Sequence, residues 1–289
     1  MKIINLVLSV CKKNLKFHVT RIKKMKTYTN IEFELKDSIG IVWLNRPEVH
    51  NAMNAEMISE IIDFFEAVNE MKDVRVVLLR GRGKSFCAGA DLNSMKGIAE
   101  FGYEENYQDS LKLAKCFNAI YTCTKPTIAI VQGAAIGGAN GLLSACDFVY
   151  CNDETKFAFS EVKLGIAPAT ISPYVIKRIG EYGSRDLMLT GRRFLGKEAE
   201  YYRLVNKSLP SDQLEDHVNS IISALMSSGP DAMAACKQLV YNISNNINFD
   251  DSIDYSAKLI AELRASKEGQ EGMASFLEKR KANWVKKNN

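Results

Sequence analysis

Histidine, proline and tryptophan are scarce: the 289 residues contain three, six and two of them. The three histidines are far apart, and none of the seven cysteines forms a Cys-x-x-Cys pair. Zinc ligation needs clustered thiolates or imidazoles, so we expect no metal site. Reduced and mostly buried thiols in an intracellular protein are expected instead.

Long hydrophobic runs are also missing. No apolar stretch reaches the roughly 18 residues that a membrane span requires, so no membrane association is expected. The chain is 46% hydrophobic and 25% charged. That composition is typical of a soluble globular protein with a sizeable core, organised as one large domain or two small ones.

Acidic residues are absent before Glu32, whereas the first 26 residues carry eight lysines and arginines. Removing those eight charges from the net +4 leaves about −4 for the rest, so a nucleic-acid partner is not expected. We interpret 1–26 as a basic, non-structural extension. It could be a poor signal peptide, a mitochondrial presequence, or translated sequence before a start at Met25. A cytoplasmic location is expected, or the mitochondrial matrix if the extension is a presequence.

Three common glycine motifs are absent as well. Gly83-Lys84-Ser85 resembles the end of a P-loop, but Leu78 stands where its first glycine belongs. There is no Gly-x-Gly-x-x-Gly after a strand, and no Gly-x-Ser-x-Gly. A dinucleotide-binding loop and a serine hydrolase elbow are therefore not expected.

Hydrophobic periodicity predicts an α/β core over 27–210 and a helical region over 211–289. Strands are expected at 31–35, 39–44, 74–79, 127–131 and 148–151, the first two joined by a turn at Asp37-Ser38. Helices are expected at 54–68, 139–146, 214–226, 230–240, 252–265 and 269–284.

Two loops of small residues follow predicted buried strands. The first covers 85–92, and the second covers 132–139, including a glycine-rich turn at 133–138 that opens a helix. Such loops expose backbone N–H groups, and two of these aimed at one point would form an oxyanion hole. Each loop taken alone is weak evidence for such a site, and a simple tight turn is then the preferred interpretation.

Four segments in this order resemble the enoyl-CoA hydratase/isomerase (crotonase) family: 44–48, 86–92, 133–138 and 159–168. Thr190-Gly191 and 276–280 match as well, so the resemblance covers about 28–285. It implies a crotonase-type α/β spiral of repeated ββα units with a C-terminal helical trimerisation region. It also implies an acyl-CoA thioester substrate, no separate cofactor because coenzyme A belongs to the substrate, and a homotrimer or dimer of trimers.

The resemblance also assigns roles to individual residues. It implies that the N–H groups of Ala90 and Gly138 hold the thioester oxygen, and that Glu161 carries a proton. The substrate-binding residues that it implies are Ala88, Gly89, Asp91, Gly137, Arg46 and Lys279. Arg46 and Lys279 would lie near the CoA phosphates, and Lys279 could reach them across a subunit interface. The alternative for both residues is that they are solvated surface charges.

One departure from the family pattern concerns the second glutamate of many hydratases, which is replaced here by Gly141. Asn140 is expected to point elsewhere, and Asp147 to end the helix. Three explanations stay open. Glu161 works alone, the enzyme is an isomerase, or the segment 98–109 supplies a group such as Tyr103, Glu104 or Glu105.

Residues 160–173 look similar to hydratases acting on methylglutaconyl-CoA, an intermediate of leucine breakdown, or on carboxygeranoyl-CoA. The leading hypothesis is a hydratase that adds water across the 2,3 double bond of an enoyl-CoA thioester. The alternatives are a Δ3,Δ2-enoyl-CoA isomerase, and a catalytically weak crotonase-fold protein that binds CoA or RNA. Arg203, where relatives tend to have glycine, has no explanation in the sequence.

Overall fold

Two sheets form the centre of the computed structural model, which describes residues 27–98 and 100–285. The basic extension predicted for 1–26 lies outside the described residues. The six-stranded sheet has the order β1-β2-β3-β4-β6-β9, and the three-stranded sheet has the order β5-β7-β8. The large sheet consists of β1 (Ile31–Lys36), β2 (Ile39–Leu44), β3 (Val76–Gly81), β4 (Thr127–Val131), β6 (Phe148–Asn152) and β9 (Lys207–Leu209). The small sheet consists of β5 (Ala134–Ile136), β7 (Lys156–Ala158) and β8 (Arg193–Leu195).

The large sheet is parallel except at one edge. There β1 pairs antiparallel with β2 through the predicted hairpin, whose turn residues Asp37 and Ser38 have φ of 52° and 67°. The strand expected at 74–79 begins two residues later, because Val74 instead donates its N–H to Met71 in a turn. The buried strands β3 and β4 carry apolar side chains on both faces, as parallel strands covered on both sides require.

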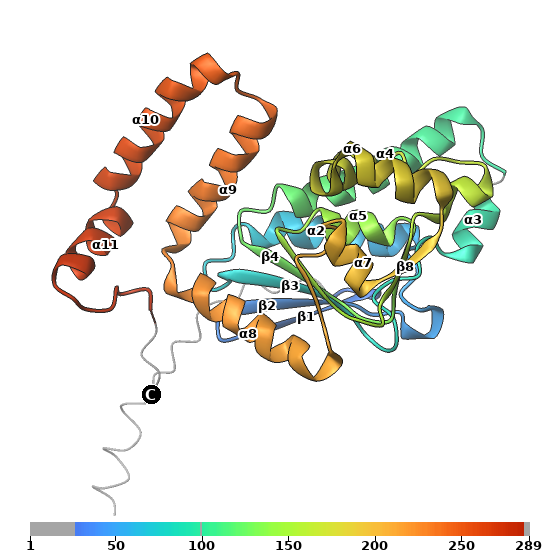
Figure 1. Cartoon of the computed structure of the whole chain (residues 1–289), viewed down its shortest axis with the longest axis horizontal. Helices are drawn as coiled ribbons and strands as arrows, with labels where there is room; N and C mark the ends of the chain where they lie inside the picture. Colours follow the sequence, from blue (N-terminus) through green and yellow to red (C-terminus); the bar gives the residue numbers. More distant parts are fainter. Residues whose placement is uncertain (1–26, 99, 286–289) are drawn as a thin grey trace, which may run out of the picture.

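Helices cover both faces of this sheet (Figure 1). The α-helices are α2 (Ala55–Val68), α3 (Leu92–Ile98), α4 (Tyr103–Tyr121), α5 (Ala139–Ser144), α6 (Ser172–Thr190), α7 (Gly196–Tyr201), α8 (Ser211–Ser227), α9 (Pro230–Asn245), α10 (Phe249–Ala265) and α11 (Lys267–Leu277). Two short 3-10 helices, η1 (Pro47–Val49) and η2 (Ser160–Leu164), complete the described elements.

Alternating side chains of the central strands enter two separate cores. Val77 and Leu79 of β3 pack with α2, α4, α5 and α6, whereas Val76 and Leu78 pack with α8 on the opposite face. This alternation follows from the two-residue side-chain period of a strand. The helical arm α9–α11 then projects away from the sheet (Figure 1).

Two sequence predictions of local structure need correction. The turn expected at 133–138 contains β5, because Ala134–Ile136 pair with β7, a partner that lies about twenty residues further along the chain. The helix expected at 269–284 ends at Leu277, where Lys279 takes a left-handed φ of 54° and Arg280 turns back to pair with Glu271. Among the described helices, none is long and apolar enough to cross a membrane.

Candidate active site

Glu161 lies on η2, directly after the buried strand β7 that leads to it. The buried aromatic rings of Phe157 and Phe159 anchor this segment, and Gly165 ends it with a left-handed φ of 75°. The Glu161 side chain is half-buried, and its Oε2 atom is buried without a hydrogen-bond partner among the described residues. Burial raises the pKa of this carboxyl above its ordinary value, as desolvation of a charged group requires.

The glycine-rich segment lies against the Glu161 carboxylate. A Cβ added to Gly137 would be 3.3 Å from Oε1 of Glu161, so only glycine leaves the carboxylate its present space. The N–H of Gly137 donates to the carbonyl of Ala158 at 2.9 Å. The next N–H, that of Gly138 at the start of α5, has no acceptor among the described residues and is therefore available to a ligand.

The neighbouring loop also carries a backbone N–H without an acceptor in the described part of the chain, that of Ala90. Met53 pairs with the residues on either side of it, since the Met53 N–H donates to Gly89 and the Asp91 N–H donates to Met53. The N–H of Ala90 itself is left without an acceptor among the described residues. A Cβ on Gly138 would be 2.9 Å from Cε of Met53, so both free N–H groups border the same methionine.

The two loops are held together by backbone contacts. Cys87 forms an isolated bridge with Ala135 of β5, and a Cβ on Gly89 would lie 2.7 Å from the carbonyl oxygen of Ile136. Ala88 donates its N–H to His50 at 2.9 Å and keeps its side chain exposed. The structure therefore brings together Ala88, Gly89, Ala90, Gly137, Gly138 and Glu161 from three separate segments.

Asp91 and Arg46 form an ion pair of their own. The Arg46 Nη1 atom is 2.9 Å from Asp91 Oδ2, and it also donates to the carbonyl of Ala52. The second carboxylate oxygen of Asp91 accepts the N–H groups of Asn93 and Ser94 and so caps α3. Within this chain both side chains hold the first loop in place, and contact of Arg46 with a CoA phosphate stays a prediction.

Lys279 is in a different part of the molecule. It follows α11 on the helical arm and is exposed. Figure 1 places α11 on the opposite side of the molecule from α3 and α5. A role for Lys279 at a ligand bound near Glu161 therefore stays a prediction, which depends on the expected arrangement across a subunit interface.

The position of the missing second glutamate is filled by neighbouring side chains. A Cβ on Gly141 would be 2.5 Å from Ile171 and 2.7 Å from the ring of Phe117, both fully buried. The helix that carries Gly141 is buried along its whole length. A carboxylate cannot stand here without displacing this packing, which explains the glycine.

We therefore expect Gly141→Glu to lower the thermal unfolding temperature and to bring no gain in activity. Overpacking of a filled core typically costs about 1–3 kcal/mol, before the cost of burying the carboxylate. Gly97→Glu on α3 is the matched control, since a Cβ there meets nothing within 4 Å. Equal unfolding temperatures for the two variants would contradict this account.

Asn140 connects the glycine loop to the strand before Glu161. Its buried Nδ2 donates to the carbonyl of Gly137 at 3.1 Å and to that of Ala158 at 2.9 Å, while its Oδ1 has no partner among the described residues. The prediction that Asn140 points elsewhere did not foresee this contact. Its only signal in the sequence is a polar residue within a helix of small apolar residues.

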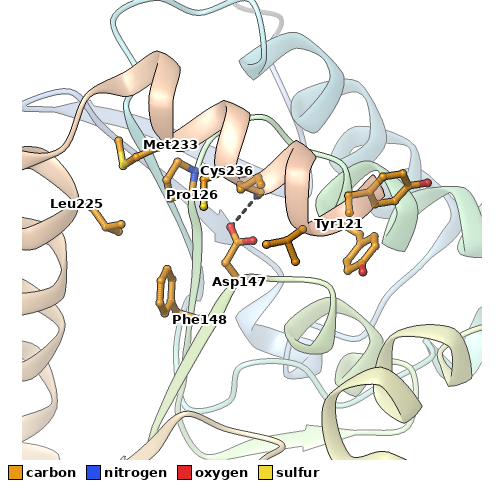
Figure 2. A pocket seen from close by; sticks show the side chains of 10 residues that line it. Tyr121, Pro126, Asp147, Phe148, Leu225, Met233 and Cys236 are labelled. Atoms are coloured by element: carbon orange, nitrogen blue, oxygen red, sulfur yellow. Dashed lines mark hydrogen bonds and ion pairs between the residues drawn. The ribbon is translucent and has the colours of Figure 1, made fainter. Parts of the chain in front are cut away.

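The other residues considered in the sequence are engaged elsewhere. Asp147 follows α5, accepts from Thr127, and forms an ion pair with Lys237 at 2.7 Å. Asp147 lines an apolar cavity of about 330 Å³ under α9, and none of the predicted site residues lines it. Figure 2 shows Asp147 among the side chains of this cavity. Glu104 and Glu105 bond to Gln108 and Gly102 at the surface of α4, and Tyr103 is 84% exposed.

Comparison with known proteins agrees with this arrangement. A family model described as enoyl-CoA hydratase/isomerase matches residues 34–287. A putative enoyl-CoA hydratase of Thermus thermophilus is 34% identical over 245 residues, which are 85% of this chain and 96% of that protein. A peroxisomal delta(3,5)-delta(2,4)-dienoyl-CoA isomerase of Arabidopsis thaliana is 30% identical over 276 residues, covering 91% of this chain and 99% of that protein.

A solved structure shows the same fold. The crystal structure of an enoyl-CoA hydratase from Shewanella pealeana has a TM-score of 0.85 and 36% identity, covering 89% of this chain and 97% of that one. Glycine loops beside a half-buried glutamate, within this α/β architecture, define an enzyme of the crotonase type. The chain belongs to the enoyl-CoA hydratase/isomerase family. The family, the fold class and the hydratase-type enzyme class predicted from the sequence are thereby confirmed.

Proposed function

We propose that this protein hydrates a 2-enoyl-CoA thioester by means of one carboxylate, that of Glu161. The observation that carries the proposal is the Glu161 Oε2 atom, which is buried without a partner among the described residues and lies beside a loop whose Gly138 N–H has no acceptor among them either. Unpartnered buried groups are costly, so a pair of them in one place is best explained by a ligand that both contact.

The free N–H groups of Ala90 and Gly138 would receive the thioester oxygen. Attack of water at C3 moves an electron pair onto that oxygen and forms an enolate. Preorganised donors stabilise such developing charge, and each is typically worth about 10²–10³ in rate. Because the donors belong to the backbone, the site requires small residues here and no particular side chain.

Glu161 would carry the proton in both halves of the reaction. As a carboxylate it takes a proton from the attacking water, whose oxygen bonds to C3. As the resulting acid it delivers that proton to C2 when the enolate collapses, so H and OH are added and the carboxylate is regenerated. The pKa raised by burial brings the base closer to neutral pH and strengthens it.

The remaining binding roles are part of the same proposal. Backbone groups of 88–91 and Gly137 would contact the acyl-CoA, while Lys279 would reach it from a neighbouring copy. Association into a homotrimer or a dimer of trimers is supported by exposed apolar side chains on the arm. These include Phe249 and Ile253 on α10, and Phe276 and Leu277 on α11.

For the acyl group we propose 3-methylglutaconyl-CoA, on the resemblance of residues 160–173 to hydratases of that type. The second candidate is an enoyl-CoA isomerase, because one carboxylate is enough to move a proton between carbons and Gly141 leaves no second. An isomerase also appears among the similar proteins.

The test is a coupled spectrophotometric and mass assay of the purified full-length protein with 3-methylglutaconyl-CoA, crotonyl-CoA and a 3-enoyl-CoA. Hydratase activity adds the mass of one water to 3-methylglutaconyl-CoA or to crotonyl-CoA. The thioester that reacts faster identifies the class of acyl group. Conversion of the 3-enoyl to the 2-enoyl thioester without any hydroxyacyl product would select the isomerase. Failure with all three would refute both.

The pH dependence follows from the state of Glu161. The carboxylate is the active base, so kcat/KM should rise with pH through the folded-state pKa, which burial raises above the ordinary 4.5. The folded protein also binds this proton more tightly than the unfolded chain does. The contribution of Glu161 to stability therefore falls as the pH rises through the same window. An acid limb of kcat/KM centred at or below 4.5 would contradict the proposed base.

A further inference from the structure

A second cavity lies between α6 and the end of α7, away from the proposed acyl-CoA site. Its volume is about 420 Å³, within the range of small-molecule sites. The lining residues that matter are Lys177, Arg178, Gly180, Tyr182, Tyr201 and Arg203. None of them belongs to the residues assigned to the thioester.

The cavity is lined by three cations and by no carboxylate. Lys177 and Arg203 are exposed, and neither side chain has an ion-pair or hydrogen-bond partner among the described residues. The Arg178 guanidinium donates only to uncharged acceptors, namely the carbonyls of Leu204 and Cys146 and the amide oxygen of Asn206. Burial lowers the pKa of Arg178, because its charge has been taken out of water, and the negative charge of Asp147 offsets this only in part.

The acids on the surrounding elements are already engaged. Glu181 pairs with Arg185, Asp186 with Arg192, and Glu200 accepts the N–H of Ser208. Asp147, whose charge acts on Arg178, is paired with Lys237. The described lining of the cavity therefore keeps its positive charge. An anion that binds in the cavity would meet this positive charge without breaking an existing ion pair.

The backbone adds to the same potential. Gly180, with φ of 70° and ψ of 175°, interrupts α6, so that a new helical segment begins just after it. Gly180 and Tyr182 both line the cavity, which places the start of this segment in the cavity wall. The first N–H groups of a helix carry partial positive charge and favour anions.

Arg203 is the residue whose presence the sequence left unexplained. It has a left-handed φ of 64°, a conformation that is strained for a side chain with a Cβ and free of strain for glycine. A strained non-glycine residue that places a free guanidinium at a cavity indicates a role for the side chain.

We propose that this cavity binds a phosphate group, either free or carried on a small organic ester. Arg203 and Lys177 would donate charge-assisted hydrogen bonds to the phosphate oxygens, with Arg178 beneath them. The exposed rings of Tyr182 and Tyr201 at the rim offer an apolar surface to the organic part of an ester. The site is independent of the proposed hydratase activity.

The test is isothermal titration of the full-length protein with inorganic phosphate and with adenosine 5′-monophosphate. Coenzyme A is left out, because its own phosphates would compete for the cavity. Phosphate binding at the thioester site is recognised as the part that the cavity variants leave unchanged. The variants are Arg203→Gly, which also relieves the backbone strain, and Lys177→Gln. The control is Lys72→Gln, an exposed lysine with no ionic partner in the described chain.

We expect saturable binding that weakens by roughly tenfold or more in each cavity variant, since hydrogen bonds to charged groups contribute about 1.5–3 kcal/mol. Lys72→Gln should bind like wild type, and thermal unfolding of Arg203→Gly should show that it folds. Tighter binding of the nucleotide than of phosphate would identify the ligand of the cavity as a phosphate ester. Equal binding of the two would identify it as free phosphate. No saturable binding, or binding unchanged in both cavity variants, would overturn the proposal.

Discussion

Replacing Glu161 with glutamine should lower kcat/KM for enoyl-CoA hydration by at least about a hundredfold. General acid–base catalysis by a positioned side chain typically contributes 10²–10⁴ in rate, and no second carboxylate of the described chain lies beside the glycine loop to replace it. Glutamine has nearly the same shape but cannot accept and return the proton. KM should change little, because the substitution removes chemistry and leaves the thioester contacts in place.

The same variant should fold normally. The Oε2 atom of Glu161 has no hydrogen-bond partner to lose in the described part of the chain, and a neutral amide removes the cost of burying a charge. Thermal unfolding of Glu161→Gln should therefore match or exceed that of wild type at pH 7. Glu154→Gln, at an exposed glutamate, is the matched control. Wild-type turnover by Glu161→Gln would exclude this carboxylate as the base.

Removing the N–H of Gly138 should have a comparable effect on rate. Gly138 has a φ of −53°, which proline can adopt. The substitution Gly138→Pro therefore removes the N–H donor and keeps the backbone φ of this position. The loss of one oxyanion donor typically costs about 10²–10³ in kcat. Activity would be followed with the thioester that wild type prefers, and folding by circular dichroism.

The variant Gly138→Ala distinguishes loss of the N–H donor from crowding by an added Cβ. Alanine keeps the N–H, and its Cβ would meet only the flexible end of Met53 at 2.9 Å, as the β-carbon of proline would. We expect Gly138→Ala to keep most of the activity that Gly138→Pro loses. Equal losses in two folded variants would mean that crowding at Met53, and not the hydrogen bond, explains the effect.

Much of the fold was predictable from local pattern. The strands β2 and β4 occupy the residues expected, because runs of apolar and β-branched residues between turns are compatible with little else. The hairpin turn and the start of α2 at its Asn54 cap were also local signals. Family resemblance placed Glu161, Ala90 and Gly138 among the candidates before any contact between them was known.

Other features depend on residues far apart in the chain. β5 exists because its three residues find β7, and Asp91 is neutralised by Arg46 from 45 positions away. The sequence by itself determined the hairpin, the central strands, the helices α2, α5 and α8–α11, and the motif that carries the carboxylate. Only the tertiary structure decided that Gly141 is packed under Phe117 and Ile171, that Asn140 joins the loop to β7, and that Glu161 is partly desolvated. Local signals act through backbone preferences, whereas burial and charge pairing arise from surroundings that exist only once the chain has folded.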